Sequence, residues 1–361
     1  MLSLQKHLPE KAQNILRKLR KNAQPPLYKR LPLPQPLSLH IDPSNLCNFQ
    51  CVFCPTGDRA LLASVNRFQG VMPLKLFRKI IDDCAAMTRH CGRKLQQVHL
   101  YKDGEPLMNK NFTAMAAYAK EKKIARNLST TTNGSLLTEE IARELIGSGI
   151  DTIRISIERG DDEGYKKITR TFDDFEGLRS KVAFLYREKK RKGSPLRIVI
   201  KINDFALSME EKRKFFHQFR PICDAIKIDT LMGWSSSEKK DFTLGVPVKT
   251  AMDGVTSLRD RLICPQPFSA LAINPNGSAS ICCVDWAYAT VVGSAADQTI
   301  LEIWQGEQLR QFRLTHAQGK RSELPACAAC QYIRGFPDSE SLDEHVETVL
   351  KTVREGLGAH E

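Results

Sequence analysis

The chain has 361 residues, of which 42% are apolar and 26% are charged, and its formal net charge at pH 7 is +13. This length is enough for one large α/β domain with a smaller appended domain. The apolar fraction is that of an ordinary globular protein, and the sequence has no run of about 18 uncharged apolar residues, which argues against a disordered chain and against a membrane-spanning helix.

Residues 1–36 form a basic N-terminal segment with eight Lys or Arg residues and one Glu, a net charge of +7. Apolar residues near helical spacing predict a basic amphipathic helix, and the prolines over 24–36 predict an extended linker after it. The helix either contacts an anionic membrane surface or an acidic partner, or packs on the following domain. No aromatic-rich basic patch indicates nucleic acid. Charged residues interrupt any signal-like apolar stretch, so a cytoplasmic location is expected.

Between residues 37 and 235, short β-branched runs alternate with longer amphipathic stretches. The expected strands are Ser38–Asp42, Gln97–Tyr101, Asn127–Thr131, Thr152–Ile157, Leu196–Ile202 and Ala225–Asp229. The expected helices cover 73–89, 109–123, 138–148, 173–192 and 209–219, with Thr138 at a helix start. This alternation predicts right-handed βαβ units and a parallel sheet. Periodicity leaves open whether the sheet is doubly wound or part of a (β/α) barrel.

The pattern changes in residues 236–336, which hold five cysteines and many turn residues. Asn276-Gly277 predicts a β-hairpin turn, and the region is interpreted as a small metal-stabilised domain. Residues 337–361 are expected to form a C-terminal helix with Asp338 or Ser339 as N-cap. Its expected apolar face consists of Leu342, Val346, Val349, Leu350 and Val353.

Polar residues follow several of the expected strands. Cys47 follows the first strand, Asp103–Pro106 the second and Asn133 the third, while Ser156 and Glu158 close the fourth. In both candidate architectures the chemistry lies at the C-terminal ends of the strands. The sequence therefore predicts a functional site at this edge.

Cys47, Cys51 and Cys54 have the spacing C-x3-C-x2-C. Three thiolates can hold three irons of a [4Fe–4S] cluster and leave the fourth iron open for a second molecule. A structural zinc ion would need a fourth ligand, and no candidate lies near in sequence. The spacing therefore favours an iron–sulfur cluster.

The Cys47–Cys54 loop, with Phe53 before its last cysteine, resembles the signature of the radical S-adenosylmethionine (SAM) superfamily. The resemblance covers about residues 37–235 and implies a partial (β/α)6 TIM-like barrel. It also implies that a [4Fe–4S] cluster binds SAM and cleaves it reductively to a 5′-deoxyadenosyl radical, with the protein positioning the cofactor. A reductant such as flavodoxin or ferredoxin is the implied partner.

Gly104-Glu105-Pro106 resembles the Gly-Gly-Glu-Pro motif that receives the SAM amino group, with Asp103 in place of the first glycine. The resemblance extends to further candidate contacts to SAM, which are Asn133, Ser156, Glu158 and Arg170. Arg170 is a candidate partner of the SAM carboxylate. The alternative interpretations are an ordinary β-turn, a buried strand end and a solvated helix face.

Cys264, Cys282, Cys327 and Cys330 are the proposed ligands of a second metal group. This set resembles the shortened "twitch" form of the SPASM domain and implies one auxiliary [4Fe–4S] cluster. Cys282 matches the family ligand better than Cys283. The alternative is a structural zinc ribbon, because a C-x2-C pair and four thiolates also suit zinc.

Four cysteine ligands would leave no open iron on the auxiliary cluster, which favours electron transfer and oxidative chemistry. The family resemblance points to the inosamine dehydrogenases, and the expected reaction is oxidation or epimerisation of an alcohol carbon on a sugar or aminocyclitol. Asp285 is a candidate base for the proton step. The alternatives are a SPASM enzyme that modifies a peptide or protein, as ribosomal-peptide and sulfatase maturases do, and a non-enzymatic zinc-binding module.

Overall fold

The computed structural model describes residues 25–203, 205, 207–246, 250–252 and 256–356. The basic amphipathic helix expected before residue 24 lies outside these ranges. None of the helices within them has the length and hydrophobicity needed to cross a bilayer.

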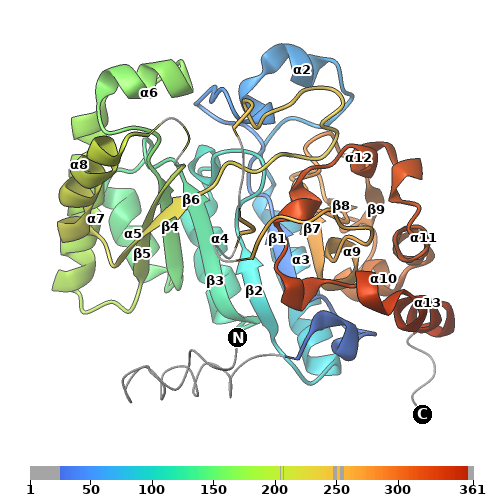
Figure 1. Cartoon of the computed structure of the whole chain (residues 1–361). Helices are drawn as coiled ribbons and strands as arrows, with labels where there is room; N and C mark the ends of the chain where they lie inside the picture. The colour runs from blue at the N-terminus through green and yellow to red at the C-terminus, as the bar shows by residue number, and fades with distance from the viewer. Residues whose placement is uncertain (1–24, 204, 206, 247–249, 253–255, 357–361) are drawn as a thin grey trace, which may run out of the picture.

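The centre of the molecule is a nine-stranded sheet in the order β6-β5-β4-β3-β2-β1-β7-β8-β9. Its strands are β1 (Ser38–Ile41), β2 (Leu95–His99), β3 (Ala125–Thr132), β4 (Thr152–Ser156), β5 (Arg197–Asn203), β6 (Ala225–Asp229), β7 (Ala270–Ile273), β8 (Ser278–Ser280) and β9 (Val291–Ser294). Strands β1 to β6 are parallel to their neighbours, as the alternating pattern predicts. The sheet stays open between β6 and β9, which gives a partial barrel (Figure 1).

Strand β7 joins the two parts of the chain, because it pairs in parallel with the free edge of β1. Strands β8 and β9 then add antiparallel. The hairpin expected at Asn276-Gly277 is confirmed: Gly277 has φ +90°, and the backbone N–H of Asn274 donates to the Ser278 carbonyl at 2.9 Å. The described strands of the cysteine-rich region therefore extend the barrel sheet.

Helices cover the outer face of the sheet. The barrel helices are α3 (Leu74–His90), α4 (Phe112–Glu121), α5 (Glu139–Gly147), α7 (Phe175–Arg191) and α8 (Met209–Phe219), and short helices α2 (Arg59–Ala63) and α6 (Asp162–Thr169) lie on loops. The later helices are α9 (Gln266–Ser269), α10 (Ile300–Gln305), α11 (Glu307–Ala317), α12 (Pro325–Ala328) and α13 (Val346–Glu355). In Figure 1, α10 to α13 surround β7–β9 at one end of the sheet.

Strand side chains alternate between the two faces, as a period of two requires. Residues that point toward the helices are apolar and fully buried, for example Leu39, Ile41 and Ile155. One continuous apolar core runs from these strands through the helices to Trp304 in α10. The opposite, inner face of the strands carries polar side chains, as described below.

Two expectations about the ends of the described chain are corrected. Helix α13 begins at Val346, and Asp338 is not its N-cap but accepts a hydrogen bond from Arg261 Nη2 at 3.1 Å. Ser339 lies in a separate 3-10 turn. The expected apolar face is nonetheless present, since Val349 and Val353 are buried.

The proline-rich stretch before β1 is also packed more closely than an extended linker. Residues Leu27–Arg30 form a 3-10 turn, and Leu27 and Leu33 are buried. The indole N–H of Trp304 donates to the Leu33 carbonyl at 2.9 Å. From Pro25 onward, this segment is therefore part of the folded domain.

Candidate functional site

The Cys47–Cys54 loop follows β1 and is held by backbone bonds to the end of α6. Gln50 N–H donates to the Thr169 carbonyl at 2.9 Å, and Val52 N–H donates to the Ile168 carbonyl at 3.0 Å. The aromatic ring of Phe53 packs against Phe205, with 5.8 Å between the ring centroids. These contacts fix a loop that has little regular structure of its own.

The three thiols of this loop are close neighbours. Burial raises the pKa of the Cys47 thiol to about 12, and the negative charges of Glu105 and Cys54 act in the same direction. Burial also raises the pKa of Cys51 and Cys54. Such thiols become thiolates when a metal compensates their charge, so this donor set fits an iron–sulfur cluster with three protein ligands.

The Gly104-Glu105-Pro106 turn lies directly against the strand end that leads to Cys47. A Cβ atom on Gly104 would lie 2.3 Å from the Ser44 carbonyl oxygen and 2.4 Å from that of Leu46, so only glycine fits. The next N–H, that of Glu105, donates to the Leu46 carbonyl at 2.8 Å. The presence of Asp103 in place of the family glycine therefore leaves the tight backbone contact of the motif intact.

The carboxylate of Glu105 is buried and accepts three hydrogen bonds. Thr132 Oγ1 donates at 2.7 Å, Asn133 N–H at 2.7 Å and Leu107 N–H at 3.0 Å. Burial raises the pKa of Glu105, and these three donors oppose the rise. A carboxylate has about four lone-pair directions, so one remains for an ammonium group such as that of SAM.

Asn133 connects the end of β3 to the cysteine loop. Its Nδ2 donates to Asn48 Oδ1 at 3.0 Å, and its Oδ1 accepts from Ser135 N–H at 2.9 Å. In this arrangement Asn133 positions the loop next to Cys47. The structure thus places Asn133 beside the cysteine loop, and its contact with SAM stays a prediction. Its pairing with Asn48 is not evident from the sequence.

The remaining SAM candidates differ in how closely they approach the cysteine loop. Glu158 is buried near Cys51, and burial raises its pKa against the opposing charges of Lys201 and Arg159. Ser156 is half-buried at the end of β4. Arg170 caps α6 with φ +63° and is exposed. Its role toward SAM stays a prediction.

Trp234 is a residue whose role the sequence leaves open. Its indole N–H donates to the Phe53 carbonyl at 3.3 Å. Trp234 follows β6, so this bond ties the last barrel strand to the cysteine loop after β1. Sequence patterns over a few residues cannot predict this contact, because 181 residues separate the two partners.

The four proposed auxiliary ligands line one pocket, which brings together Cys264, Cys282, Cys327 and Cys330. Cys283 is absent from its lining, and the Cys283 thiol lies beside Cys282, His40 and Tyr332. Within the described ranges, no three His, Cys, Asp or Glu side chains surround one point as ligands of a single metal ion. A cubane cluster takes one thiolate at each of four separate irons.

Asp285 lies in the turn after Cys282, but its carboxylate is already occupied. It is fully buried and accepts from Ala289 N–H at 3.0 Å, Thr290 N–H at 2.8 Å and Thr290 Oγ1 at 2.7 Å. These bonds close the loop between β8 and β9. The structure thus gives Asp285 a role in the turn, and we do not propose it as the base.

Comparison with known families adds to this geometry. The model of the radical SAM superfamily matches residues 41–200, and that of an iron–sulfur cluster-binding domain, SPASM, matches residues 264–331. The chain belongs to the radical SAM superfamily and carries a SPASM domain. It is a radical SAM enzyme, and the two cysteine sets described above lie within the two matched regions.

Curated relatives match only part of this chain. A probable GTP 3′,8-cyclase of Methanocaldococcus jannaschii is 26% identical over 53% of this chain and 66% of its own length. An Fe-coproporphyrin III synthase of Methanosarcina barkeri is 29% identical over 37% of this chain and 28% of its own length. The matches thus span less than two thirds of these relatives.

Solved structures match over most of the chain at low identity. BtrN in complex with AdoMet and 2-DOIA is 17% identical, with a TM-score of 0.51 over 83% of this chain and 96% of BtrN. SuiB of Streptococcus suis bound to S-adenosylmethionine is 16% identical, with a TM-score of 0.57 over 89% of this chain and 77% of SuiB. AdoMet-bound anSMEcpe is 16% identical, with a TM-score of 0.56 over 89% of this chain and 96% of that chain. These likenesses show the fold.

Proposed function

We propose that this radical SAM enzyme oxidises or epimerises an alcohol carbon on a sugar- or aminocyclitol-like small molecule. When bound, the first cluster and SAM supply a 5′-deoxyadenosyl radical that removes a substrate hydrogen atom, and the auxiliary cluster accepts an electron. Cys47, Cys51 and Cys54 would hold the first cluster, with Glu105 at the SAM amino group. Cys264, Cys282, Cys327 and Cys330 would hold the second.

The observation that carries the proposal is the polar inner face of the strands. The interior of a closed TIM barrel is filled mainly by branched apolar side chains. Here neighbouring strands contribute ionisable and hydroxyl groups to the face opposite the helices. They are His40, His99, Ser129, Arg154, Lys201 and Asp229.

These side chains interact across adjacent strands. His99 Nδ1 lies 2.9 Å from Ser129 Oγ, Arg154 Nη1 donates to the same oxygen at 3.2 Å, and Lys201 Nζ lies 3.2 Å from a carboxylate oxygen of Asp229. Burial lowers the pKa of His99 well below its usual value, and the nearby Arg154 and His40 act in the same direction. A neutral His99 and the guanidinium of Arg154 offer hydrogen bonds to the hydroxyl oxygens of a sugar- or cyclitol-like ligand.

The test is substrate-dependent release of 5′-deoxyadenosine. Anaerobically reconstituted full-length enzyme would be incubated with SAM, reduced flavodoxin and either a panel of aminocyclitols and sugars or a panel of short peptides. We expect release above the substrate-free rate with a member of the first panel. Release that responds to a peptide alone would refute the proposal and favour the peptide-modifying alternative.

A variant pair sharpens this test. Removing the guanidinium in Arg154→Met should raise KM about 10- to 100-fold, the loss expected for one hydrogen bond to a charged group. Arg143→Met is the control, because Arg143 lies on the outer surface in an ion pair with Glu139. Equal KM values for the two variants would show that the inner face does not bind the substrate.

A further inference from the structure

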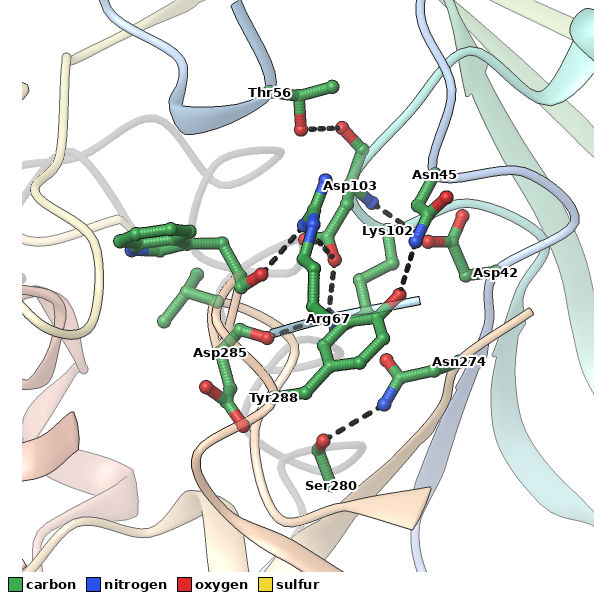
Figure 2. Close-up of polar contacts among 12 residues, drawn as sticks. Asp42, Asn45, Thr56, Arg67, Lys102, Asp103, Asn274, Ser280, Asp285 and Tyr288 are labelled. Carbon is green, nitrogen blue, oxygen red and sulfur yellow. Dashed lines mark hydrogen bonds and ion pairs between the residues drawn. The ribbon is translucent and has the colours of Figure 1, made fainter. Parts of the chain in front are cut away.

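A buried cluster of three charged side chains lies between the SAM motif and the auxiliary hairpin (Figure 2). We call Arg67, Lys102 and Asp103 the Asp103 cluster. The Asp103 carboxylate lies 2.6 Å from Lys102 Nζ and 3.3 Å from Arg67 Nη1, and all three side chains have zero exposure. Asp103 is the residue that replaces the first glycine of the Gly-Gly-Glu-Pro motif.

Both cations also bind the backbone of the loop after Cys282. Lys102 Nζ donates to the Asp285 carbonyl at 2.9 Å, and Arg67 Nη1 donates to the Trp286 carbonyl at 2.6 Å. Asp285 and Trp286 follow the proposed auxiliary ligand Cys282 by three and four residues, respectively. The side chains of the Asp103 cluster thus connect the SAM motif to the backbone of the auxiliary loop.

Two further bonds run from the cysteine loop to the same place. Thr56 Oγ1, two residues after Cys54, donates to the Asp103 carbonyl at 2.7 Å. Asn45 Nδ2, two residues before Cys47, donates to Tyr288 Oη at 2.7 Å. Both ends of the cysteine loop are therefore anchored to the cluster or to the auxiliary loop, as Figure 2 shows.

Charge balance explains why the carboxylate is central. A buried charge is tolerated when it is paired, and removing one partner leaves the other charge uncompensated. Asp103 faces two cations, so its loss would leave both without their nearest anion and would favour their movement toward water. The nearby carboxyl of Asp42 is also buried and accepts a 3.4 Å bond from Asp103 N–H.

We propose that Asp103 is a positioning residue that holds Lys102 and Arg67 so that they fix the Cys282–Tyr288 segment against the Cys47–Cys54 loop. The cluster thereby sets the separation of the two iron–sulfur sites. This role rests on the proposed function, in which the substrate gives a hydrogen atom to the deoxyadenosyl radical, an electron to the auxiliary cluster and a proton to water or a base. The test below uses no substrate, so it is independent of substrate identity.

Asp103→Asn keeps the size of the side chain and removes its charge. In the reconstituted full chain we expect hydrogen exchange at the amides of Ala289 and Thr290 to accelerate about tenfold or more, as for the loss of a hydrogen bond to a charged group. Pulsed dipolar spectroscopy of the two reduced clusters should show a broader distribution of distances. Exchange in the outer barrel helices, such as α5, should stay unchanged.

Lys79→Met is the matched control. Lys79 Nζ also binds a carboxylate, Asp83, at 2.9 Å and a carbonyl of the C-terminal region, Gln298, at 2.9 Å. This pair lies on α3, away from both cysteine sets, so its loss should leave exchange at 289–290 and the distance distribution unchanged. Lys102→Arg, which keeps the cation, should resemble the wild type more closely than Lys102→Met does.

Two outcomes would overturn the proposal. One is an Asp103→Asn protein whose loop exchange and distance distribution equal those of the wild type. The other is a uniform acceleration of exchange over the whole barrel, which would mean that Asp103 contributes to global stability and not to the placement of one loop.

Discussion

Replacing Gly104 with alanine tests whether backbone contact at the SAM motif controls loading of the first cluster. The added Cβ would lie 2.3 Å from the Ser44 oxygen, 2.4 Å from the Leu46 oxygen and 2.7 Å from the Asn45 carbonyl carbon. All three atoms belong to the backbone, so no side-chain rotation relieves the clash. To reach 3.0 Å, the shortest contact that real Cβ atoms show, the two segments must separate by about 0.7 Å.

The size of the effect follows from two contributions. Forcing one extra methyl into a packed site costs about 1–3 kcal/mol, and separating the segments weakens the bond from Glu105 N–H to the Leu46 carbonyl, worth about 1 kcal/mol. We therefore expect the free energy of unfolding to fall by about 2–4 kcal/mol. Cys47 directly follows Leu46, so the same displacement should impair binding of the first cluster.

The assay combines urea unfolding with iron counting after anaerobic reconstitution. Two cubane clusters correspond to about eight irons per chain, and Gly104→Ala should retain about four. Gly147→Ala is the control, since a Cβ there meets no atom within 4 Å. If Gly104→Ala binds as much iron and is as stable as Gly147→Ala, the reasoning from close backbone contact is wrong.

Two other predictions concern Asp42 and the adjacent cysteines Cys282 and Cys283. Burial and the charge of Asp103 raise the pKa of Asp42 to about 8, against the attraction of Lys102 and Arg67, and Tyr288 also lies near. The protonated Asp42 carboxyl therefore contributes its full share to the free energy of unfolding below the unfolded pKa of about 4. This share is lost as pH rises through about 8, and over that rise the free energy of unfolding falls by up to about 1.4 kcal/mol per pH unit. Asp42→Asn should flatten the pH dependence of urea unfolding over this range, and an unchanged slope would contradict the raised pKa. Iron counting should give about four irons for Cys282→Ser and about eight for Cys283→Ser, and the reverse order would exchange their roles.

Local patterns in the sequence predict much of the fold. All six expected barrel strands are present, although β2 begins and ends two residues earlier than expected. Thr138 caps α5 as expected, because its Oγ1 accepts from Ile141 N–H at 3.1 Å. These elements depend on periodicity, capping and turn chemistry, all of which act over a few residues.

Features that depend on long-range packing escape such reasoning. Helix α6 is not among the expected barrel helices, and it supplies two backbone acceptors for the cysteine loop. The pairing of β7 with β1 joins segments more than 200 residues apart. For Asp285, nearness to a cysteine ligand suggests catalysis, whereas its true partners depend on how the following loop closes. Local patterns contain no information about these contacts.

The parallel pairing of β7 with β1 has a consequence for dissecting the protein. Cutting the chain near residue 235 would strip β1 of one neighbour and expose a row of unpaired amides immediately before the first cysteine loop. Open edges of this kind recruit other chains and promote aggregation. The N-terminal part should therefore aggregate when it is isolated, and its iron chemistry is best studied with the C-terminal part attached.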